Sequence, residues 1–560
     1  MKKRRLGLAI AVIIGAMPFT AKAQPTATFS YFSYTGNDAR FQQQYDKEDQ
    51  YVNPVLAGFY PDPSVCRVGD TFYLVNSSFS FFPGVPLFES KDLVNWQQIG
   101  HVLDRPSQLP LEGQAVSSGI YAPDIKYNSK NKTYYMITTN VGKGNFYVKA
   151  TDPRKGWSEP IYLPKIDGID PSFYFGDDGI AYIVHNAPVV GQADYEGQRA
   201  IRILKFDVEN DCTVGEPHEI VRGGTHVTER PIWIEGPHLY RIGKYYYLMC
   251  AEGGTGDAHS EVIFRAPLKA DLTQPSSWEE CPFNPILTQR DLTGKRPDRV
   301  ICTGHADLVQ DQQNQWWAVF LGCRPYERSF YNTGRETFLL PVTWRDGWPI
   351  ILEKGKAVPT ILNKQGVSGS QRLMTGNISF IDRFDSPSLH PRWIFLRNPD
   401  MRRFQWGKGA GLTIKPAAVD ISEVKSPSAL FCRQQHTNFT IDTELTFSPE
   451  SRKQLAGLAL LQNEQYHFVF GKTRLDGKPA VVLKRTENTQ VLIASSFIPS
   501  DQPLRLRVVG SGRYYSFYYA IGQTDWQTLA TGVDAVQLST DRSGGFVGTS
   551  IGPYATCANQ

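Results

Sequence analysis

The sequence has few of the features that mark membrane, disulfide-rich or helical proteins. Beyond its N-terminus it contains no apolar run long enough to cross a bilayer, which argues against a membrane span. Its 8 cysteines follow neither a disulfide ladder nor a zinc-site spacing, so buried thiols are the favoured interpretation. Cys302–Cys323 and Cys432–Cys557 bridges stay open. No long stretch keeps the 3.6-residue period of an amphipathic helix.

Net charge is also low once the N-terminus is set aside. Residues 1–23 have the pattern of a secretory signal, with basic Lys2–Arg5, apolar Leu6–Ala16 and a small-residue cleavage site. Removing the five basic residues of this segment leaves 54 basic against 55 acidic side chains. A near-neutral surface argues against nucleic acid or an anionic membrane as a partner. The signal predicts export to the periplasm, with an extracellular location as the alternative.

Aromatic residues, glycine and proline are abundant. An aromatic content of 12%, with 48 Gly and 37 Pro, indicates a turn-rich, all-β protein. A module of a polar residue, a short strand, a tight turn and an aromatic strand occurs five times, at intervals of roughly 46 to 70 residues. The polar residues of the five modules are Asp62, Asp124, Asp170, Glu235 and His305. This repetition predicts a five-bladed β-propeller in which these side chains converge on one end of the central channel.

The length of the chain supports at least two domains. Residues 24–50 are polar and are predicted to run over the surface as a leader, and residues 51–365 contain the propeller modules. A linker with Lys, Gly, Ser and Gln follows. Residues 377–560 then show closely spaced alternating strands, which predict a β-sandwich.

Glu235 lies between apolar residues and a Gly-Pro turn. Partial removal from water favours the neutral form of a carboxyl group, as a general acid requires. A lone Glu before a strand is more often a cap, just as a lone Asp62 before proline is more often a turn residue. Glu229 and Glu252 do not hold the module position, and structural roles are expected for them. Several acids and a histidine in one pocket favour chemistry over a scaffold role.

Seven stretches stand in an order that is typical of one enzyme family. They are Asn53–Ser64, Phe82–Val85, Ser90–Trp96, Gly168–Ser172, Glu235–Tyr240, Gly304–Asp307 and Gly334–Thr337. On these stretches the chain resembles glycoside hydrolase family 43. Its C-terminal part resembles the jelly-roll, concanavalin-like sandwich of the two-domain β-xylosidase/α-L-arabinofuranosidase branch.

The resemblance implies inverting, single-displacement hydrolysis at the non-reducing end of pentose chains. By position, Asp62 matches the general base, Glu235 the general acid, and Asp170 the carboxylate that holds the acid's orientation and pKa. Base and acid carboxyl groups of inverting glycosidases stand about 6.5–9.5 Å apart, a gap that opposite sides of a channel can supply. Asp124 has no consistent match and is not expected to be catalytic.

The resemblance also implies substrate-binding residues. Arg335 matches an arginine of the sugar pocket, and Phe82 and Tyr121 match aromatic walls, although relatives often have tryptophan at the second position. His305 matches a central histidine that in relatives sometimes lies beside a water or a calcium ion; a core histidine is an equal alternative. Phe546, in the last loop of the sandwich, is expected to narrow the pocket. No cofactor and no catalytic metal are expected, and a structural calcium ion near His305 is allowed.

The favoured function is an exo-acting α-L-arabinofuranosidase on plant hemicellulose or pectin side chains, because Tyr121 and the short loop at Gly544–Ser550 differ from the dedicated xylosidase. β-D-Xylosidase activity on xylo-oligosaccharides, alone or combined, is the alternative, since the two sugars present similar hydroxyl groups. A non-catalytic carbohydrate-binding propeller is the rival from another class, but it would not need three convergent acids. The expected partner is an oligosaccharide or polysaccharide, and the sequence does not set the oligomeric state.

Overall fold

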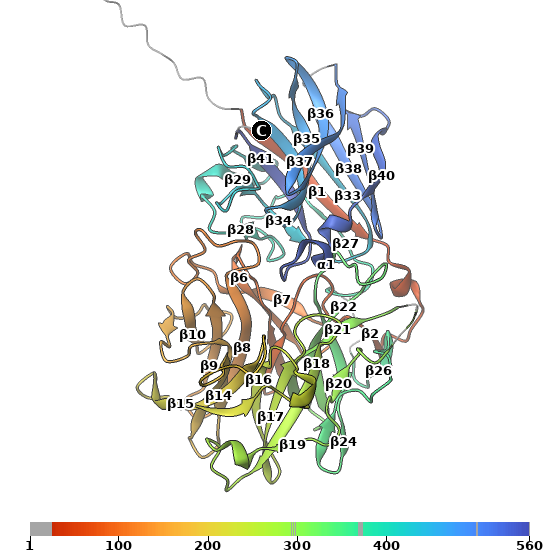
Figure 1. Cartoon of the computed structure of the whole chain (residues 1–560). Coiled ribbons are helices and arrows are strands. Elements are labelled where there is room, and N and C mark those ends of the chain that lie inside the picture. The colour runs from red at the N-terminus through yellow and green to blue at the C-terminus, as the bar shows by residue number, and fades with distance from the viewer. Residues whose placement is uncertain are drawn as a thin grey trace, which may run out of the picture.

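The computed structural model describes residues 25–292, 294, 296, 298–367, 373–499 and 502–558. A ring of blades and a two-layered β-sandwich lie against each other (Figure 1). The predicted signal, residues 1–23, lies outside the described residues. Within the described ranges the α-helix is confined to α1 (Thr540–Ser543), and no helix has the length and apolar character of a membrane span.

Five antiparallel sheets form the ring, which confirms the predicted five-bladed propeller. The first three blades are β3 (Ser64–Val68), β4 (Thr71–Val75), β6 (Gly84–Ser90) and β7 (Gln97–Leu103); β8 (Ile120–Asn128), β9 (Thr133–Asn140), β10 (Gly144–Ala150) and β11 (Ile161–Tyr162); β12 (Ile169–Phe175), β13 (Ala181–Pro188), β14 (Arg199–Asp207) and β15 (Cys212–Arg222). The last two are β16 (Glu235–Ile242), β17 (Tyr245–Glu252), β18 (Ser260–Pro267), β19 (Glu279–Glu280) and β20 (Leu287–Thr288); β21 (Ile301–Gln310), β22 (Trp316–Cys323) and β23 (Glu336–Pro341).

Each blade has, within or just before its innermost strand, a residue with a left-handed backbone. These residues are Asp62, Ala122, Asp170, Gly236 and His305, with φ between 30° and 55°, and β21 contains a second one, Cys302, with φ 58°. The pairing register of β8, β12, β16 and β21 shifts at the same places, which marks β-bulges. All but the last of the five are followed by proline, which fits a bulge because the lost N–H has no ladder partner there.

These bulges correct the module register expected from the sequence. The structural equivalent of Asp62 and Asp170 in the second blade is Ala122, so Asp124 lies two residues deeper in the channel. In the fourth blade the equivalent is Gly236, and Glu235 precedes it by one residue. The aromatic spacing fixed the modules only to within a few residues, because a bulge inserts a residue without changing the strand pattern.

The start of the propeller chain closes the ring against its last blade. β2 (Gln50–Val52) pairs with β26 (Ile361–Asn363). The Asn53 side chain donates to the Leu339 carbonyl and accepts from the Leu339 N–H, both at 2.9 Å. The Asn53 contacts join the segment that enters the first blade to β23 of the fifth blade.

The sandwich contains two large sheets, which confirms the predicted second fold. The first comprises β29 (Phe404–Gly407), β30 (Gly411–Ile414), β1 (Ala27–Gly36), β33 (Asn438–Thr446), β38 (Leu504–Ser511), β39 (Tyr514–Ile521) and β40 (Gln527–Asp534), with β27 (Ser379–Asp382) on β1. The second comprises β31 (Ser428–Ala429), β41 (Ser550–Thr556), β34 (Leu455–Asn463), β35 (Tyr466–Leu475), β36 (Lys478–Glu487) and β37 (Thr489–Phe497), with β32 (Cys432–Arg433) on β41.

The N-terminal leader expected at residues 24–50 is wrong for its first half. β1 is an inner strand of the sandwich, flanked by β30 and β33, and Figure 1 shows it in red among blue strands. Phe29 and Phe32 are fully buried in the sandwich core. A bulge between these two residues breaks the simple in–out alternation, which hid the strand in the sequence.

Buried charged side chains join the two domains. Arg433 of the sandwich donates to the Phe59 carbonyl at 2.9 Å, and its guanidinium lies 4.5 Å from the Tyr60 ring centroid. Arg397 is fully buried, donates to the Gln114 carbonyl at 2.5 Å and forms an ion pair with Glu464. Buried charges that lose such partners are strongly destabilising, so these contacts fix one relative placement of the domains.

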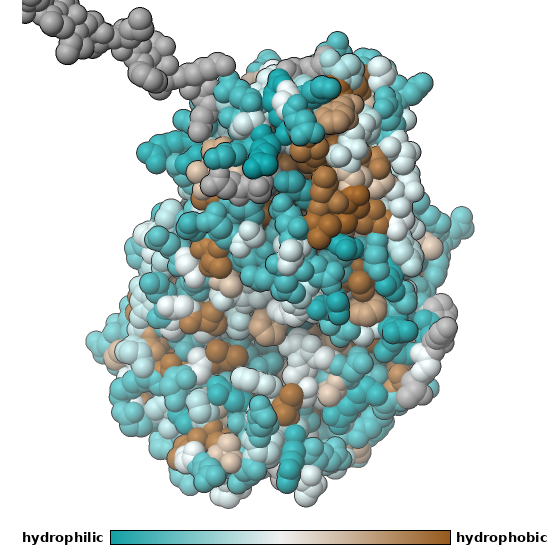
Figure 2. Space-filling model, turned by 45° about the horizontal axis from the view of Figure 1, so that its top comes forward, coloured by the Kyte–Doolittle hydropathy of each residue, from teal (hydrophilic) through white to brown (hydrophobic). Residues whose placement is uncertain are grey.

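The outer surface is largely hydrophilic in the view of Figure 2, with a broad apolar patch on the sandwich and smaller apolar spots elsewhere. On β37 of the sandwich, Val491, Leu492 and Phe497 are exposed. Scattered exposed apolar residues are ordinary on a folded protein, and the patch in this view lies away from the blades.

Candidate active site

One pocket, with a cavity volume of about 640 Å³, gathers the polar ends of several blades. Its lining includes Asp62, Asp170, Glu235, His305 and Arg335. The remaining lining residues are Phe79, Tyr121, Ala122, Ile169, Arg199, Ile232, Trp233, Gly253, Gly254, Thr255, Gly256 and Phe546. Two larger hollows, of about 920 and 800 Å³, contain none of the module residues. The pocket is therefore where the predicted chemistry can occur.

Asp62 is held in its ionised form. Burial alone would raise its pKa, but the Arg335 guanidinium and the Ser77 hydroxyl hold the pKa below its ordinary value. Arg335 Nη1 donates to Asp62 Oδ1 at 2.8 Å, and Ser77 Oγ donates to Oδ2 at 2.5 Å. An ionised carboxylate with one side open to a cavity can accept a proton from water.

Glu235 has the opposite character. Burial, together with the negative charges of Asp170 and Asp62, raises the pKa of Glu235 well above its ordinary value. Burial and Asp62 also raise the pKa of Asp170, to about 7. The two carboxyl groups titrate as a pair, and the Gly236 N–H, which donates to Asp170 Oδ2 at 3.1 Å, favours the charge on Asp170. The proton therefore stays on Glu235, which can donate it.

His305 packs directly beneath the turn that follows Glu235. A Cβ added to Gly236 would stand 2.8–3.0 Å from three atoms of the His305 ring, so only glycine fits there. Burial lowers the pKa of His305 to about 4, which keeps the ring neutral. Its Nδ1 lies 3.7 Å from Asp62 Oδ1. The histidine thus supports both the base and the turn that carries the acid.

Three aromatic rings form one wall of the pocket. The Tyr121 and Phe546 rings meet edge to face at 5.6 Å, and the Phe79 and Phe546 rings stack at 6.4 Å. The Phe546 N–H donates to Ser117 Oγ at 3.0 Å, and Arg335 Nη2 donates to the Phe546 carbonyl at 3.4 Å. A loop of the sandwich therefore completes the propeller's pocket at the position expected from the sequence.

Phe82 does not belong to this wall, and its expected place in the pocket is wrong. β5 (Phe81–Phe82) pairs with β28 (Phe395–Leu396) of the C-terminal part, and Phe82 packs in the core beside Val85. Phe79 occupies the pocket instead. Three phenylalanines in four residues follow one another there, and spacing alone cannot say which ring turns inward; the left-handed backbone of Phe79, with φ 50°, decides it.

Sequence reasoning missed Arg199, Ile232 and Trp233, which also line the pocket. Arg199 comes from the start of β14, and its guanidinium lies 5.1 Å from the Trp233 ring centroid. No motif marks these residues, because their contacts join segments that are distant in the chain.

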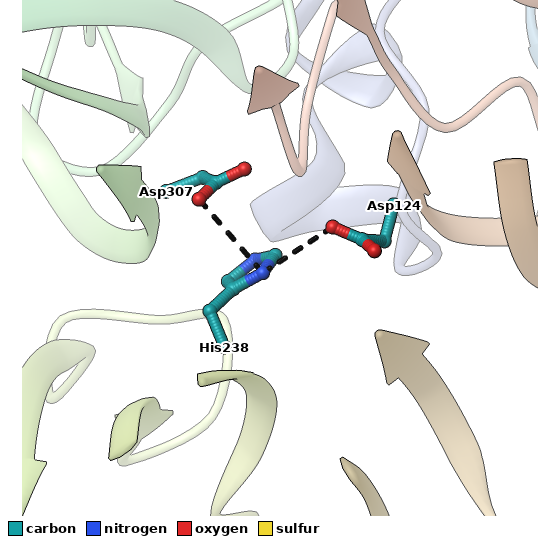
Figure 3. A group of neighbouring side chains, drawn as sticks. All are labelled: Asp124, His238 and Asp307. Atoms are coloured by element: carbon teal, nitrogen blue, oxygen red, sulfur yellow. Dashed lines mark ion pairs between the residues drawn. The ribbon is translucent and has the colours of Figure 1, made fainter. Parts of the chain in front are cut away.

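A second ring of polar residues lies beneath the first. It comprises the residues two positions beyond each of the five left-handed residues: Ser64, Asp124, Ser172, His238 and Asp307. Asp124, His238 and Asp307 point toward one another (Figure 3), with His238 Nδ1 3.4 Å from Asp124 and 3.9 Å from Asp307. Lys126 Nζ lies 3.1 Å from Asp124 and 2.9 Å from Asp307, so it forms an ion pair with each acid.

The described side chains do not fit a calcium ion well. Between the two rings lies a void of about 10 Å³, bordered by Asp62, Asp170 and His305 among others, which has room for about one water molecule. Calcium requires six to eight oxygen ligands. The carboxylates of the lower ring already bind Lys126, and His238 offers nitrogen.

The described cysteines form no disulfide, so neither bridge left open by the sequence is present. Cys302 and Cys323 lie in one buried cluster on neighbouring strands, whereas Cys432 and Cys557 each donate to a backbone carbonyl.

Comparison with known proteins agrees with this geometry. The family described as "Glycosyl hydrolases family 43" matches residues 51–349, and the "Beta xylosidase C-terminal Concanavalin A-like domain" matches residues 381–560. The chain belongs to glycoside hydrolase family 43. It is therefore a glycosidase, and this family inverts the anomeric configuration.

Relatives cover nearly the whole chain. A xylosidase/arabinosidase of Butyrivibrio fibrisolvens is 38% identical over 90% of this chain and 95% of its own. A non-reducing end α-L-arabinofuranosidase of Bacteroides ovatus, BoGH43B, is 34% identical over 91% and 92%. A β-xylosidase of Bacillus subtilis is 31% identical over 88% and 94%. A solved GH43_12 structure from a capybara gut metagenome is 40% identical, with a TM-score of 0.88 over 95% of this chain and 100% of that one.

Proposed function

We propose that this protein is an exo-acting α-L-arabinofuranosidase that releases terminal non-reducing residues from plant hemicellulose or pectin side chains. One observation carries the proposal: an ionised Asp62 and a protonated Glu235 share one pocket with Asp170. An acid and a base with pKa values pushed apart are what single-displacement glycoside hydrolysis needs.

In the proposed reaction Asp62 takes a proton from the water that attacks the anomeric carbon. Glu235 gives its proton to the departing glycosidic oxygen as the old C–O bond breaks. The new C–O bond forms on the opposite face, so the configuration inverts. Asp62 ends protonated and Glu235 ionised, and exchange with solvent restores both. Asp170 orients the acid through the Gly236 turn, and Arg335 holds Asp62 ionised beside the sugar.

Exo action is supported by the wall that the sandwich adds. Phe546, Phe79 and Tyr121 contact one another at the pocket. A ring cluster of this kind leaves room for a chain end but not for a continuous polymer on that side. Arg335 is tied to the same wall through the Phe546 carbonyl.

Two sugars match the chemistry of the pocket, since arabinofuranose and xylose present similar hydroxyl groups. Tyr121 and the short loop at Gly544–Ser550 support arabinofuranose. The Bacteroides ovatus relative is named as an arabinofuranosidase, and the Bacillus subtilis relative as a β-xylosidase. β-D-Xylosidase activity, alone or in combination, is therefore the second candidate.

The test compares 4-nitrophenyl α-L-arabinofuranoside with 4-nitrophenyl β-D-xyloside, and arabino- with xylo-oligosaccharides. The wild-type rate ratio names the sugar. Glu235→Ala is expected to lose about 10²–10⁴ in kcat on oligosaccharides and less on the activated nitrophenyl substrates. Glu229→Ala, an exposed acid nearby, is the matched control.

Full activity of Glu235→Ala on oligosaccharides would contradict the assignment of the acid. Absence of turnover by the wild type on every pentoside, with retained binding, would favour the carbohydrate-binding propeller.

Export to the periplasm remains part of the proposal and rests on residues 1–23. Fractionation of cells that make the full chain, with N-terminal sequencing of the product, tests it. An intact N-terminus in the cytoplasmic fraction would contradict it.

A further inference from the structure

Trp233 is held in an unusual backbone conformation at the mouth of the pocket. Its φ is 52°, and its side chain is 39% exposed. A bulky residue with positive φ is a genuine outlier that costs free energy and is retained where the surroundings fix it, commonly at functional sites. An exposed indole on a strained turn beside a carboxyl pair calls for a ligand rather than a packing role.

The surroundings of Trp233 form a built site. Its N–H donates to the Gly197 carbonyl at 2.9 Å. Asn186, which is fully buried, donates to the Ile234 carbonyl at 2.6 Å and accepts from Arg199 at 2.8 and 3.2 Å. One buried amide therefore holds both the turn that carries Trp233 and the guanidinium that lies over its ring.

Arg199 and Trp233 lie on the side of the pocket where Glu235, the acid, stands. Trp233 precedes Glu235 by two residues, and the positive charge of Arg199 acts on Glu235 and Asp170. The base side is built from other residues, since Asp62 is bound by Arg335 and Ser77. The acid protonates the departing oxygen, so the group attached to that oxygen must lie on the acid side.

We propose that Arg199 and Trp233 form the leaving-group subsite, where Trp233 stacks on a neutral pyranose ring and Arg199 hydrogen-bonds to its hydroxyl groups. This inference rests on the proposed function and adds the chemical class of the departing unit, a sugar ring of the polysaccharide main chain. Aromatic faces bind the C–H face of a pyranose, and guanidinium offers several donors in a fixed plane.

The experiment compares two leaving groups on the same glycone. One substrate is an arabinofuranosyl-substituted oligosaccharide, and the other is α-L-arabinofuranosyl fluoride, whose leaving group has no ring; the xylosyl pair is used if the wild type prefers xylose. Trp233→Ala is expected to lower kcat/KM on the oligosaccharide about 10-fold while leaving hydrolysis of the fluoride within about two-fold. Arg199→Gln is expected to show the same selectivity, and Trp233→Tyr to recover most of the loss.

Trp344→Ala is the matched control, because Trp344 is also 39% exposed but lies on β24 (Thr343–Arg345), outside the pocket lining. Its two rates should not change. Should Trp233→Ala not fold, Trp233→Leu keeps apolar bulk without a flat ring and gives the same comparison.

Equal losses of Trp233→Ala on both substrates would overturn the inference and place Trp233 against the released sugar. Unchanged rates on both would also overturn it. A wild type that hydrolyses no pentosyl fluoride and no oligosaccharide would instead overturn the proposed function, so the two failures are distinguishable.

Discussion

Asp62 and Glu235 share one pocket yet hold opposite charge states, and the difference comes from their partners rather than from burial. Desolvation raises both pKa values. Asp62 additionally receives Arg335 at 2.8 Å and the Ser77 hydroxyl, whereas Glu235 faces the negative charges of Asp170 and Asp62. Activity should therefore fall below the pKa of Asp62 and above that of Glu235, which gives a bell-shaped pH profile.

Removal of the positive charge at Arg335 should move this profile upward in pH. Arg335 lowers the pKa of both Asp62 and Glu235, and it contacts Asp62 directly at 2.8 Å. In Arg335→Gln we expect both limbs of kcat/KM to shift to higher pH, the acidic limb more, together with a lower maximum. Arg345→Gln, an exposed arginine on β24, is the control. An unmoved acidic limb would contradict the role given to Arg335.

Removal of the negative charge at Asp170 should move only the alkaline limb downward. Among the neighbouring charges, that of Asp170 raises the pKa of Glu235 most. Asp170→Asn keeps an oxygen that can accept from the Gly236 N–H, but the acid then loses its proton at lower pH. The pH dependence of kcat/KM measures this shift. An alkaline limb that stays at the same pH or moves to higher pH would show that Asp170 does not raise the pKa of Glu235.

At this scale the sequence predicted the carboxylates and Arg335, but not every residue that surrounds them. The Asp-Pro-Ser signatures at Asp62 and Asp170 can be read directly, because proline and the turn sit in the chain beside them. The choice of Phe79 over Phe82 depends on one left-handed φ, which no spacing reveals. The Arg199–Trp233 contact depends on strand pairing between distant segments.

Bulges are the elements that position the site. Each one places a residue at or next to the bulge in the pocket and the residue two places beyond it in the lower ring. Aromatic spacing identified the blades, but it could not resolve Ala122 from Asp124, because both fall within the window that the spacing allows.

Gly236→Ala tests how tightly one bulge is packed. Gly236 and Gly243 both have a left-handed backbone, with φ 55° and 59°, but a Cβ meets His305 only at Gly236 and open space at Gly243. The left-handed backbone alone should make each alanine cost about 1–2 kcal/mol of stability. Gly236→Ala should cost more than that and lower kcat, whereas Gly243→Ala should keep its activity. Thermal unfolding and steady-state rates measure both, and equal effects would contradict the argument.

The lower ring stabilises the channel through a partly buried lysine. Lys126 forms ion pairs with Asp124 and Asp307 at 3.1 and 2.9 Å. Lys126→Met should lower the free energy of unfolding by about 3–5 kcal/mol, because it leaves buried charge unpaired. The double variant Lys126→Met/Asp307→Asn should regain part of that loss in chemical denaturation. A double variant as unstable as the sum of the single ones would contradict the pairing.

Addition of a chelator tests the ion allowed near His305. Because the void holds about one water and the nearby acids already bind Lys126, EDTA dialysis should change neither kcat nor Tm. Loss of either property, restored by added calcium, would show that an ion occupies the channel.

On the scale of the whole molecule, the two domains share one active site. They also share a small sheet, in which β5 pairs with β28. Phe546 reaches the pocket from the sandwich, and the buried Arg397–Glu464 and Arg433–Phe59 contacts hold the sandwich in place. The two-domain fold could be predicted from the change in strand spacing. The place of β1 could not, because its bulge disturbs the alternation that marks a strand.

Substitution in β1 should therefore unfold a domain that lies mostly at the other end of the sequence. Phe29 and Phe32 are fully buried in the sandwich. Phe32→Ala should lower the free energy of unfolding by about 3–5 kcal/mol. Thr35→Ala, an exposed residue of the same strand, should change it little. Denaturant unfolding gives both values, and a Phe32→Ala protein of wild-type stability would contradict the place assigned to β1.

β1 and β27 are antiparallel neighbours, with Phe32 opposite Asp382, and the whole propeller lies between them in the chain. The propeller thus stands where a hairpin would have its turn, as an insertion in a discontinuous sandwich. Ser30 of β1 contacts Glu444 of β33, 414 residues later. During synthesis β1 is made long before its partner β33. It therefore cannot pair in its sheet until most of the chain has been made.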